Sequence, residues 1–133
     1  MDSVTYGLAA YIIFTIVGIR YLIKKYRNLR PHVDGLELEE LKEWLNDGAI
    51  LWDVRSEREW ETGLLSEAIA VGYGPLPSRV DPKQKIVCYC TSGIRSRAMA
   101  ENLKKAGAES VAYFIGGYHH LKEDSSFNVI IPS

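Results

Sequence analysis

The 133-residue chain has little cysteine and little histidine, and their arrangement does not fit a metal site. Two cysteines in a chain of this length do not form a disulfide framework. The three histidines, His32, His119 and His120, show none of the spacing with cysteine that structural zinc sites require. We therefore expect no metal and no cofactor.

An excess of charge is also missing, because 16 lysines and arginines stand against 17 aspartates and glutamates. A nearly neutral chain has no global field that attracts a polyanion, so we expect no binding to nucleic acid. The hydrophobic content of 47% and the charged content of 25% argue against disorder. The chain therefore fits one domain with one additional element.

Charge is scarce above all in one segment near the N-terminus. Residues 3–23 are mostly apolar and contain a single charged side chain, Arg20. About 20 such residues span a bilayer, so the sequence predicts one transmembrane helix, with Arg20 reaching the interface. A cleaved signal peptide and a buried globular helix are the alternatives. The first would have basic residues before the apolar run, and against the second, Tyr6, Tyr11 and Tyr21 resemble interfacial anchors.

Basic residues follow this segment. Residues 24–33, KKYRNLRPHV, contain a proline and no apolar periodicity, which predicts a juxtamembrane linker. The positive-inside rule then places the N-terminus outside and the rest of the chain in the cytoplasm, as a single-pass membrane protein. Both cysteines should be thiols in that reducing compartment. A membrane-protein partner is a further expectation from this anchoring.

From residue 34 onward, short apolar runs alternate with amphipathic segments, which is typical of an α/β domain with a parallel sheet. Leucines at helical spacing predict a helix over residues 36–47, and a second helix is expected over 95–107. Residues 72–84 are rich in glycine and proline and are predicted to be a loop, with room for one helical turn. The expected strands are 49–54, 67–72, 85–89 and 110–117.

The sequence CTSGIRSR, residues 90–97, stands between a predicted strand and a predicted helix. A loop that enters a helix N-terminus directs several backbone N–H groups to one point, and the helix dipole adds positive potential there. Cys90 occupies the C-terminal end of the strand, where open α/β sheets bind their ligands. We expect these donors, with the guanidinium groups of Arg95 and Arg97, to lower the pKa of the Cys90 thiol.

The rest of this loop suits a bound group, because its residues are small and Gly93 allows a tight turn. The small polar residues are Thr91, Ser92 and Ser96. Cys88 lies within an apolar strand and is predicted to be buried and inert. A bond between Cys88 and Cys90 is disfavoured, since residues two apart in a strand are about 6.6 Å apart. The plain alternative for Cys90 is a cysteine packed at a strand end.

These residues resemble the rhodanese superfamily. The loop resembles its active-site motif Cys-x-x-Gly-x-Arg, and LWDVRSEREWETG resembles its Asp-x-Arg segment followed by Glu, a bulky residue and Gly. The later AYFIGGY resembles its strand that leads to paired glycines. The matching residues are Cys90, Gly93, Arg95, Asp53, Arg55, Glu59 and Gly63. The resemblance covers about residues 34–124.

The resemblance implies a rhodanese-like three-layer fold over residues 34–133, with a central, mostly parallel sheet flanked by helices. It also implies a sulfurtransferase in which Cys90 takes sulfur from thiosulfate or a persulfide and passes it, as a persulfide, to a thiol or cyanide-like acceptor. The residues so implied to hold the donor are Thr91, Ser92, Gly93, Ile94, Arg95 and Ser96. Asp53 and Arg55 would either support this cradle or only fix their own turn.

Two other functions remain open on the same fold. One is a non-catalytic docking or assembly module of a membrane complex. The other is a phosphatase or arsenate reductase, which the six-residue loop from Cys90 to Arg95 disfavours, because the related phosphatases use a ring one residue longer. The chain also departs from the family pattern. Leu64 replaces the usual histidine, and the usual tryptophan after the paired glycines is missing, so we expect Tyr118 to provide the aromatic cover.

Overall fold

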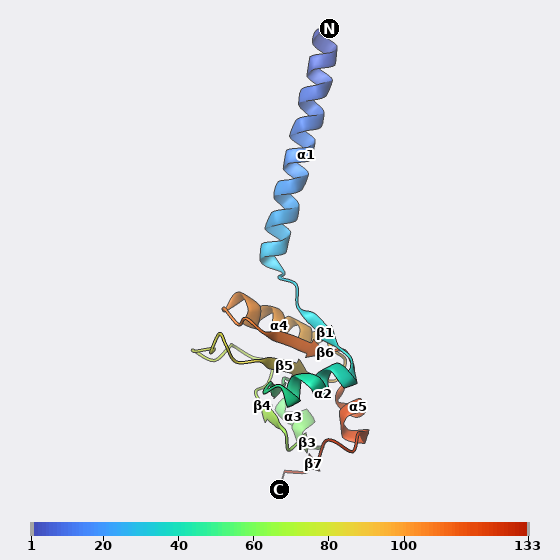
Figure 1. Cartoon of the computed structure of the whole chain (residues 1–133), viewed down its shortest axis with the longest axis vertical. Helices are drawn as coiled ribbons and strands as arrows, with labels where there is room; N and C mark the ends of the chain where they lie inside the picture. Colours follow the sequence, from blue (N-terminus) through green and yellow to red (C-terminus); the bar gives the residue numbers. More distant parts are fainter. Residues whose placement is uncertain (1, 133) are drawn as a thin grey trace. The chain divides into compact units, whose positions relative to one another are not determined.

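The structure is a computed structural model that describes residues 2–132, with the backbone alone for residues 27–29. The chain divides into two compact units, one ending at His32 and one beginning at Val33. Figure 1 shows the elements of both units coloured along the sequence. Each unit is considered separately below.

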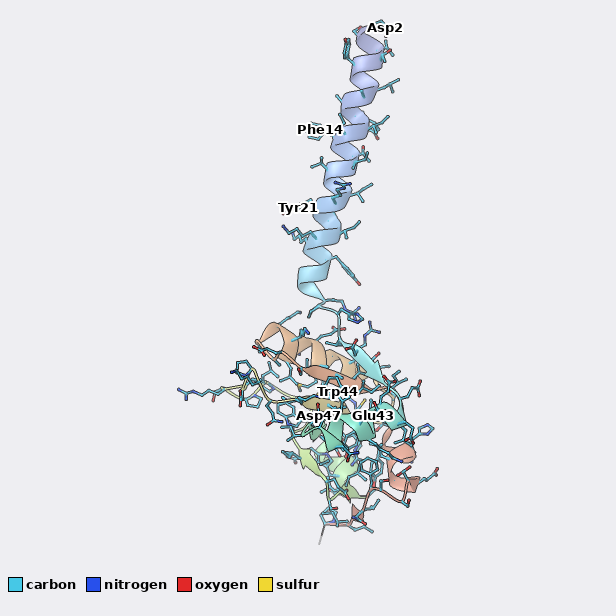
Figure 2. All side chains as sticks on the ribbon, in the orientation of Figure 1. Asp2, Phe14, Tyr21, Glu43, Trp44 and Asp47 are labelled. Atoms are coloured by element: carbon cyan, nitrogen blue, oxygen red, sulfur yellow. The ribbon has the colours of Figure 1, made fainter. Side chains whose placement is uncertain are left out.

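The first unit is a single helix, α1 (Ser3–Leu29). The Asp2 side chain caps its N-terminus by accepting the N–H of Thr5 at 3.0 Å. Its apolar side chains, Phe14 and Tyr21 among them, are exposed along its length (Figure 2). By length and composition, the segment Ser3–Tyr26 is sufficient to cross a membrane. Signal sequences and core helices of soluble proteins share this length and composition.

Helix α1 continues through residues 24–29, which the sequence analysis assigns to a linker. The two lysines, the arginine and the leucine of this segment favour helix, so helical geometry persists where the apolar run ends. The helix stops before Pro31, which disfavours α geometry in the preceding residue. Arg30 accordingly adopts φ −130° and ψ 87°.

The second unit contains a five-stranded sheet whose neighbouring strands are all parallel. The strands are β1 (Asp34–Leu36), β2 (Ile50–Asp53), β4 (Ala68–Ala70), β5 (Ile86–Tyr89) and β6 (Val111–Phe114). Their spatial order is β1-β6-β5-β2-β4. A separate antiparallel pair joins β3 (Leu64–Leu65) to β7 (Val129–Ile130). The predicted α/β class and parallel sheet are therefore confirmed.

Helices cover both faces of the sheet, which gives the expected three layers (Figure 1). The domain helices are α2 (Leu38–Asn46), α3 (Glu57–Trp60), α4 (Ile94–Lys105) and α5 (Tyr118–Glu123). Strand β5 shows the division between the faces, because its successive side chains point to opposite sides. Cys88 and Cys90 pack with Met99 and Leu103 of α4. Val87 and Tyr89 belong instead to the core cluster that contains residues of α2 and α5.

Strands β2, β4, β5 and β6 and helices α2 and α4 lie within the predicted segments or start one residue earlier. Residues 72–84 contain neither helix nor strand, as the loop prediction requires. The sequence analysis did not predict β1, α3, β3, α5 or β7. Each of them is short and contains no run of four apolar residues, unlike β5 and β6. Two of them, α3 and α5, nevertheless help to build the site described next.

Candidate active site

The loop between β5 and α4 places Cys90 directly after Tyr89, the last residue of the strand. Gly93 ends the loop with φ 88°, a left-handed conformation that other residues adopt only with strain. Its carbonyl accepts the N–H of Arg97 at 3.0 Å and so begins helix α4. A Cβ at Gly93 would also lie 3.2 Å from the carbonyl oxygen of Ile115. Glycine at this position therefore allows both the turn and its close packing.

The Cys90 sulfur is enclosed by the loop, and the residue has no exposed surface. The N–H of Gly93 donates to Sγ at 3.0 Å. The Ser96 hydroxyl, also buried, lies 3.4 Å from Sγ and 3.1 Å from the carbonyl oxygen of Gly93. In the thiol form, S–H donates to the hydroxyl, which donates to Gly93. Once the sulfur has lost its proton, rotation of the same hydroxyl lets it donate to the thiolate.

These contacts lower the pKa of the Cys90 thiol. Burial acts to raise this pKa, because it disfavours the charged form. The Ser96 hydroxyl and the backbone N–H groups of Ser96, Ser92 and Gly93 outweigh burial by donating to the thiolate. The pKa of Cys90 therefore falls below its ordinary value, whereas burial raises the pKa of Cys88. The predicted difference between the two cysteines, one inert and one activated, has a physical basis here.

Replacing Ser96 with alanine is expected to shift the pH dependence of Cys90 reactivity to higher pH. The thiolate loses a donor, so its pKa rises and a higher pH is needed for the same thiolate fraction. The measurement is the rate of Cys90 alkylation by iodoacetamide from pH 5 to 10, followed by intact mass. Ser92→Ala is the matched control, because Ser92 contributes through its backbone N–H. Coincident profiles for Ser96→Ala and wild type would contradict this account.

Arg95 is held by Glu59, a residue of α3 that the sequence analysis did not assign to the site. The guanidinium forms a two-point pair with the carboxylate, at 2.6 Å and 3.0 Å. The Thr91 hydroxyl donates to the same carboxylate at 2.6 Å. The Arg95 guanidinium, and after it the Thr91 hydroxyl, keeps the pKa of Glu59 well below its usual range, although partial burial opposes the shift. Glu59 thus links α3 to both ends of the loop as a carboxylate.

This pairing changes the expected roles of several loop residues. The Arg95 charge is neutralised by Glu59, and the Thr91 hydroxyl is already used. Arg97, which the sequence places beside the thiol, pairs instead with Glu101 at 3.4 Å, one turn along α4. The Ile94 side chain is 76% exposed and points to solvent. The lowered pKa of Cys90 therefore rests mainly on Ser96 and the backbone N–H groups, and the charge of Arg95 is not among its largest causes.

Glu59 occupies this position because α3 begins with a capping box. The Ser56 side chain accepts the N–H of Glu59 at 3.3 Å, and the Glu59 carboxylate accepts the N–H of Ser56 at 3.1 Å. The pattern Ser-x-x-Glu is readable in the sequence and indicates a helix start. The partner, Arg95, lies 36 residues further along the chain, so the contact itself appears only in the folded structure.

Asp53 and Arg55 form a buried ion pair at the end of β2. Their side chains are 0% and 2% exposed, and the shortest of their contacts is 2.8 Å. The Tyr89 hydroxyl donates to Asp53 at 2.6 Å, and Arg55 donates to the carbonyl of Gly63 at 2.8 Å. The guanidinium also lies 3.8 Å from the centre of the Tyr118 ring. This pair therefore joins the end of β2 to Tyr89 of β5 and to Gly63 before β3.

Gly117 lets the segment after β6 approach the loop. The Tyr118 N–H donates to the carbonyl of Cys90 at 2.9 Å. A Cβ at Gly117 would overlap the carbonyl oxygen of Thr91 and lie 2.8 Å from its carbonyl carbon. The backbone of Gly117, with φ −109° and ψ 176°, is open to any residue, so the requirement for glycine is purely steric.

Gly117→Ala is expected to displace the loop and to lower the reactivity of Cys90 up to about a hundredfold, the cost of a misplacement of about 1 Å. We expect a loss of about 1–3 kcal/mol in the free energy of unfolding from the same overlap. Alkylation rates and urea denaturation measure the two effects. Gly74→Ala is the control, since no atom lies within 4 Å of a Cβ there. Equal effects of the two substitutions would refute the steric argument.

A cavity of about 310 Å³ lies beside the loop. Its lining residues are Arg55, Glu59, Thr62, Thr91, Tyr118, His119 and Lys122. The Tyr118 side chain is 5% exposed and forms part of this wall beneath Arg55. His119 and Lys122, to which the sequence analysis gave no role, project from α5 with exposed side chains.

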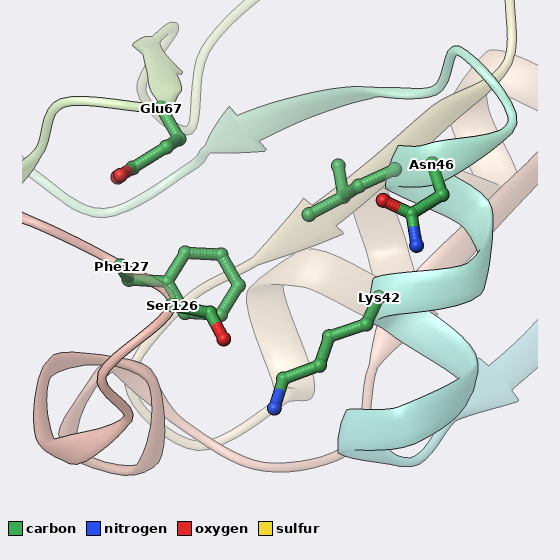
Figure 3. Close-up of a pocket in the computed structure, with 6 residues that line it drawn as sticks. Lys42, Asn46, Glu67, Ser126 and Phe127 are labelled. Atoms are coloured by element: carbon green, nitrogen blue, oxygen red, sulfur yellow. The ribbon is translucent and has the colours of Figure 1, made fainter.

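A second cavity, of about 350 Å³, is lined by Lys42, Leu45, Asn46, Glu67, Ser126 and Phe127 (Figure 3). Its charged side chains already have partners. Lys42 pairs with Asp124 at 3.1 Å, and Glu67 accepts the backbone N–H of Asn128 at 3.0 Å. No residue of the Cys90 loop lines it. Of these two cavities, the first has a wall residue, Thr91, from the Cys90 loop.

The family profile of the rhodanese-like domain matches residues 37–124, which include the loop, Glu59 and the paired glycines. The chain belongs to the rhodanese-like domain family. A thiosulfate sulfurtransferase, GlpE of Coxiella burnetii, is 25% identical over 105 residues, covering 73% of this chain and 94% of that protein.

Solved structures agree with this assignment of the rhodanese-like fold. A rhodanese-related protein from Thermoplasma volcanium aligns with a TM-score of 0.61 and 22% identity, over 74% of this chain and 99% of the other. The human single-domain sulfurtransferase TSTD1 aligns with a TM-score of 0.59 and 20% identity, over 71% and 100%. At this identity the two structures establish the fold alone. Helix α1 lies outside the residues that the family profile matches.

Proposed function

We propose that this rhodanese-like chain is a sulfurtransferase in which Cys90 carries the transferred sulfur. The observation that carries the proposal is the environment of the Cys90 sulfur. The Gly93 N–H at 3.0 Å and the Ser96 hydroxyl at 3.4 Å favour the thiolate, which is the nucleophilic form of cysteine. Membership of the rhodanese-like family and the similarity to GlpE support the same activity.

The reaction proceeds by two displacements. The Cys90 thiolate attacks the outer sulfur of thiosulfate, the donor S–S bond breaks, and its electron pair leaves with sulfite. Cys90 is then a persulfide anion, stabilised by the donors that held the thiolate. An acceptor thiolate or cyanide next attacks the outer sulfur and returns the electron pair of the second S–S bond to Cys90. Neither step needs an oxidant or a reductant.

The test is incubation of the full chain in detergent with thiosulfate, followed by intact mass. We expect a gain of one sulfur atom on Cys90, and its loss on addition of cyanide with formation of thiocyanate. A phosphatase arm uses para-nitrophenyl phosphate, and we expect no hydrolysis, because the ring from Cys90 to Arg95 is one residue shorter than in the related phosphatases. Cys90-dependent hydrolysis without sulfur uptake would replace the proposal by a phosphatase.

One observation favours a second candidate, a docking module that does not use Cys90 chemically. Ile94 and Ile115 are 76% and 47% exposed, and both lie next to Gly93 at the loop. An apolar surface at this place suits contact with another protein. A docking role predicts that Cys90→Ser keeps the cellular phenotype and that Ile94→Asp removes it. A sulfurtransferase role predicts loss with Cys90→Ser.

We further propose that α1 anchors the domain to a membrane, with the N-terminus outside and the domain in the cytoplasm. The sequence has one acidic residue before the apolar run and basic residues at its end. The basic residues are Arg20, Lys24, Lys25, Arg27 and Arg30. In intact cells, a membrane-impermeant maleimide should label Ser3→Cys and should not label Glu109→Cys. The reverse pattern would overturn this topology. If both positions are labelled and carbonate extraction releases the chain from the membrane fraction, the anchor itself is refuted.

A further inference from the structure

The cavity beside the loop is larger than an inorganic donor requires. Its volume of about 310 Å³ lies at the lower end of the range of about 300–1,000 Å³ for small-molecule sites. Thiosulfate would fill a small part of that space. Thr91, the residue after Cys90, belongs to the wall, so a molecule in the cavity lies next to the loop. The cavity therefore has room for an organic group attached to the reacting sulfur.

Of the charged side chains that line the cavity, Arg55 and Glu59 are in ion pairs, and the ammonium group of Lys122 can still bind an anion. Arg55 is paired with Asp53, and the Glu59 carboxylate is paired with Arg95 from outside the wall. Lys122 is exposed, and its ammonium group lies 5.9 Å from the centre of the Tyr118 ring. Among the side chains that the structure describes, no carboxylate lies within ion-pair distance of Lys122. Lys122 therefore gives the wall a positive charge that forms no ion pair with any described carboxylate.

We propose that this cavity binds the organic part of a low-molecular-weight persulfide and that Lys122 binds its carboxylate. The inference rests on the proposed sulfurtransferase function and names the donor class for it. A carboxylate in the cavity gains an ion pair with Lys122, whereas a neutral donor of equal size gains only the contact surface. In this arrangement the Cys90 loop binds the reacting sulfur of the donor, and Lys122 of α5 binds the carboxylate at its other end.

The chemical step needs nothing beyond the donor. The Cys90 thiolate attacks the outer sulfur of R–S–SH, the S–S bond of the donor breaks, and the electron pair leaves with R–S⁻. The proton stays on the transferred sulfur as Cys90–S–SH until the persulfide ionises. The carboxylate of the R group takes no part in this exchange, so Lys122 affects recognition and not the bond changes.

The test compares two persulfides of similar size, those of 3-mercaptopropionate and 2-mercaptoethanol, of which only the first has a carboxylate. The full chain in detergent micelles is mixed with each, quenched by alkylation, and the second-order rate of sulfur loading on Cys90 is measured by intact mass. We expect wild type to prefer the carboxylate donor about fivefold, the upper range for an exposed ion pair. Lys122→Gln should reduce this preference to about one, and Lys122→Arg should retain it.

Lys104→Gln is the matched control, because Lys104 lies in the last turn of α4 and does not line the cavity. Its donor preference should equal that of wild type, and it should load sulfur from thiosulfate within about twofold of the wild-type rate. The inference is overturned if wild type loads both persulfides equally fast, or if the preference survives in Lys122→Gln. Loading by no donor at all would instead reject the proposed function, so the two failures are distinguishable.

Discussion

Cys90→Ser should reduce sulfur transfer from thiosulfate to cyanide by at least about a thousandfold, as loss of a covalent nucleophile does in other enzymes. Serine nearly keeps the size of the side chain, accepts the Gly93 N–H and donates to the Ser96 hydroxyl as the thiol does. It has no sulfur with which to form a persulfide, and its hydroxyl remains protonated at neutral pH. The measurement is thiocyanate formation by the full chain, with intact mass to show that no sulfur is bound.

Cys88→Ala provides the matched control for this prediction. Cys88 packs on the same face of β5 and is also fully buried, and burial raises the pKa of its thiol. Its removal should cost about 1–2 kcal/mol of stability through the small cavity left behind and should leave transfer near the wild-type rate. If Cys88→Ala loses activity and Cys90→Ser keeps it, Cys88 carries the sulfur and the assignment to Cys90 is wrong.

Asp53→Ala should lower the free energy of unfolding by about 3–5 kcal/mol, which is the usual cost of leaving one member of a buried ion pair alone. The substitution strands the Arg55 guanidinium, 2% exposed, and leaves the Tyr89 hydroxyl without its acceptor. Urea denaturation of the full chain in detergent, followed by tryptophan fluorescence, measures this loss. Trp52 is a suitable reporter because it precedes Asp53 in β2 and is 7% exposed.

Asp47→Asn is the control for the buried pair. Asp47, labelled in Figure 2, pairs with Lys85, and its side chain is 75% exposed. Removing its charge should cost less than about 1 kcal/mol, because water screens an exposed pair. Similar losses for Asp53→Ala and Asp47→Asn would show that burial does not set the energy of the Asp53–Arg55 pair.

The sequence was informative where the signal is local. The apolar runs of β2 and β5, the helical spacing in α2 and the motif from Cys90 to Arg95 each lie within one short segment. The position of Cys90 at the end of a strand and Gly93 at the start of a helix followed from the same segments. Both determine the site, since backbone donors converge on the sulfur there.

The sequence was uninformative where a contact joins distant segments. The guanidinium of Arg95 can pair with a bound anion or with a carboxylate of the chain, and the sequence does not say which. The folded structure shows that the carboxylate of Glu59 is the partner. Arg97 looked equivalent to Arg95 in the sequence, but its place on α4 directs it to Glu101. Lys122 was inconspicuous because α5 is too short to show periodicity, and its cavity is formed by α3, α5 and the loop together.

The hydrogen bonds at the Cys90 sulfur have a consequence for how such a site changes over evolution. The lowered pKa of Cys90 depends on main-chain groups, Gly93 among them, and on one interior hydroxyl, whereas the side chains of Ser92 and Ile94 face solvent. Main-chain donors survive most substitutions. The outward positions of the loop can therefore drift, or be redesigned, to suit a new donor or partner protein while the acidity of the sulfur is inherited unchanged.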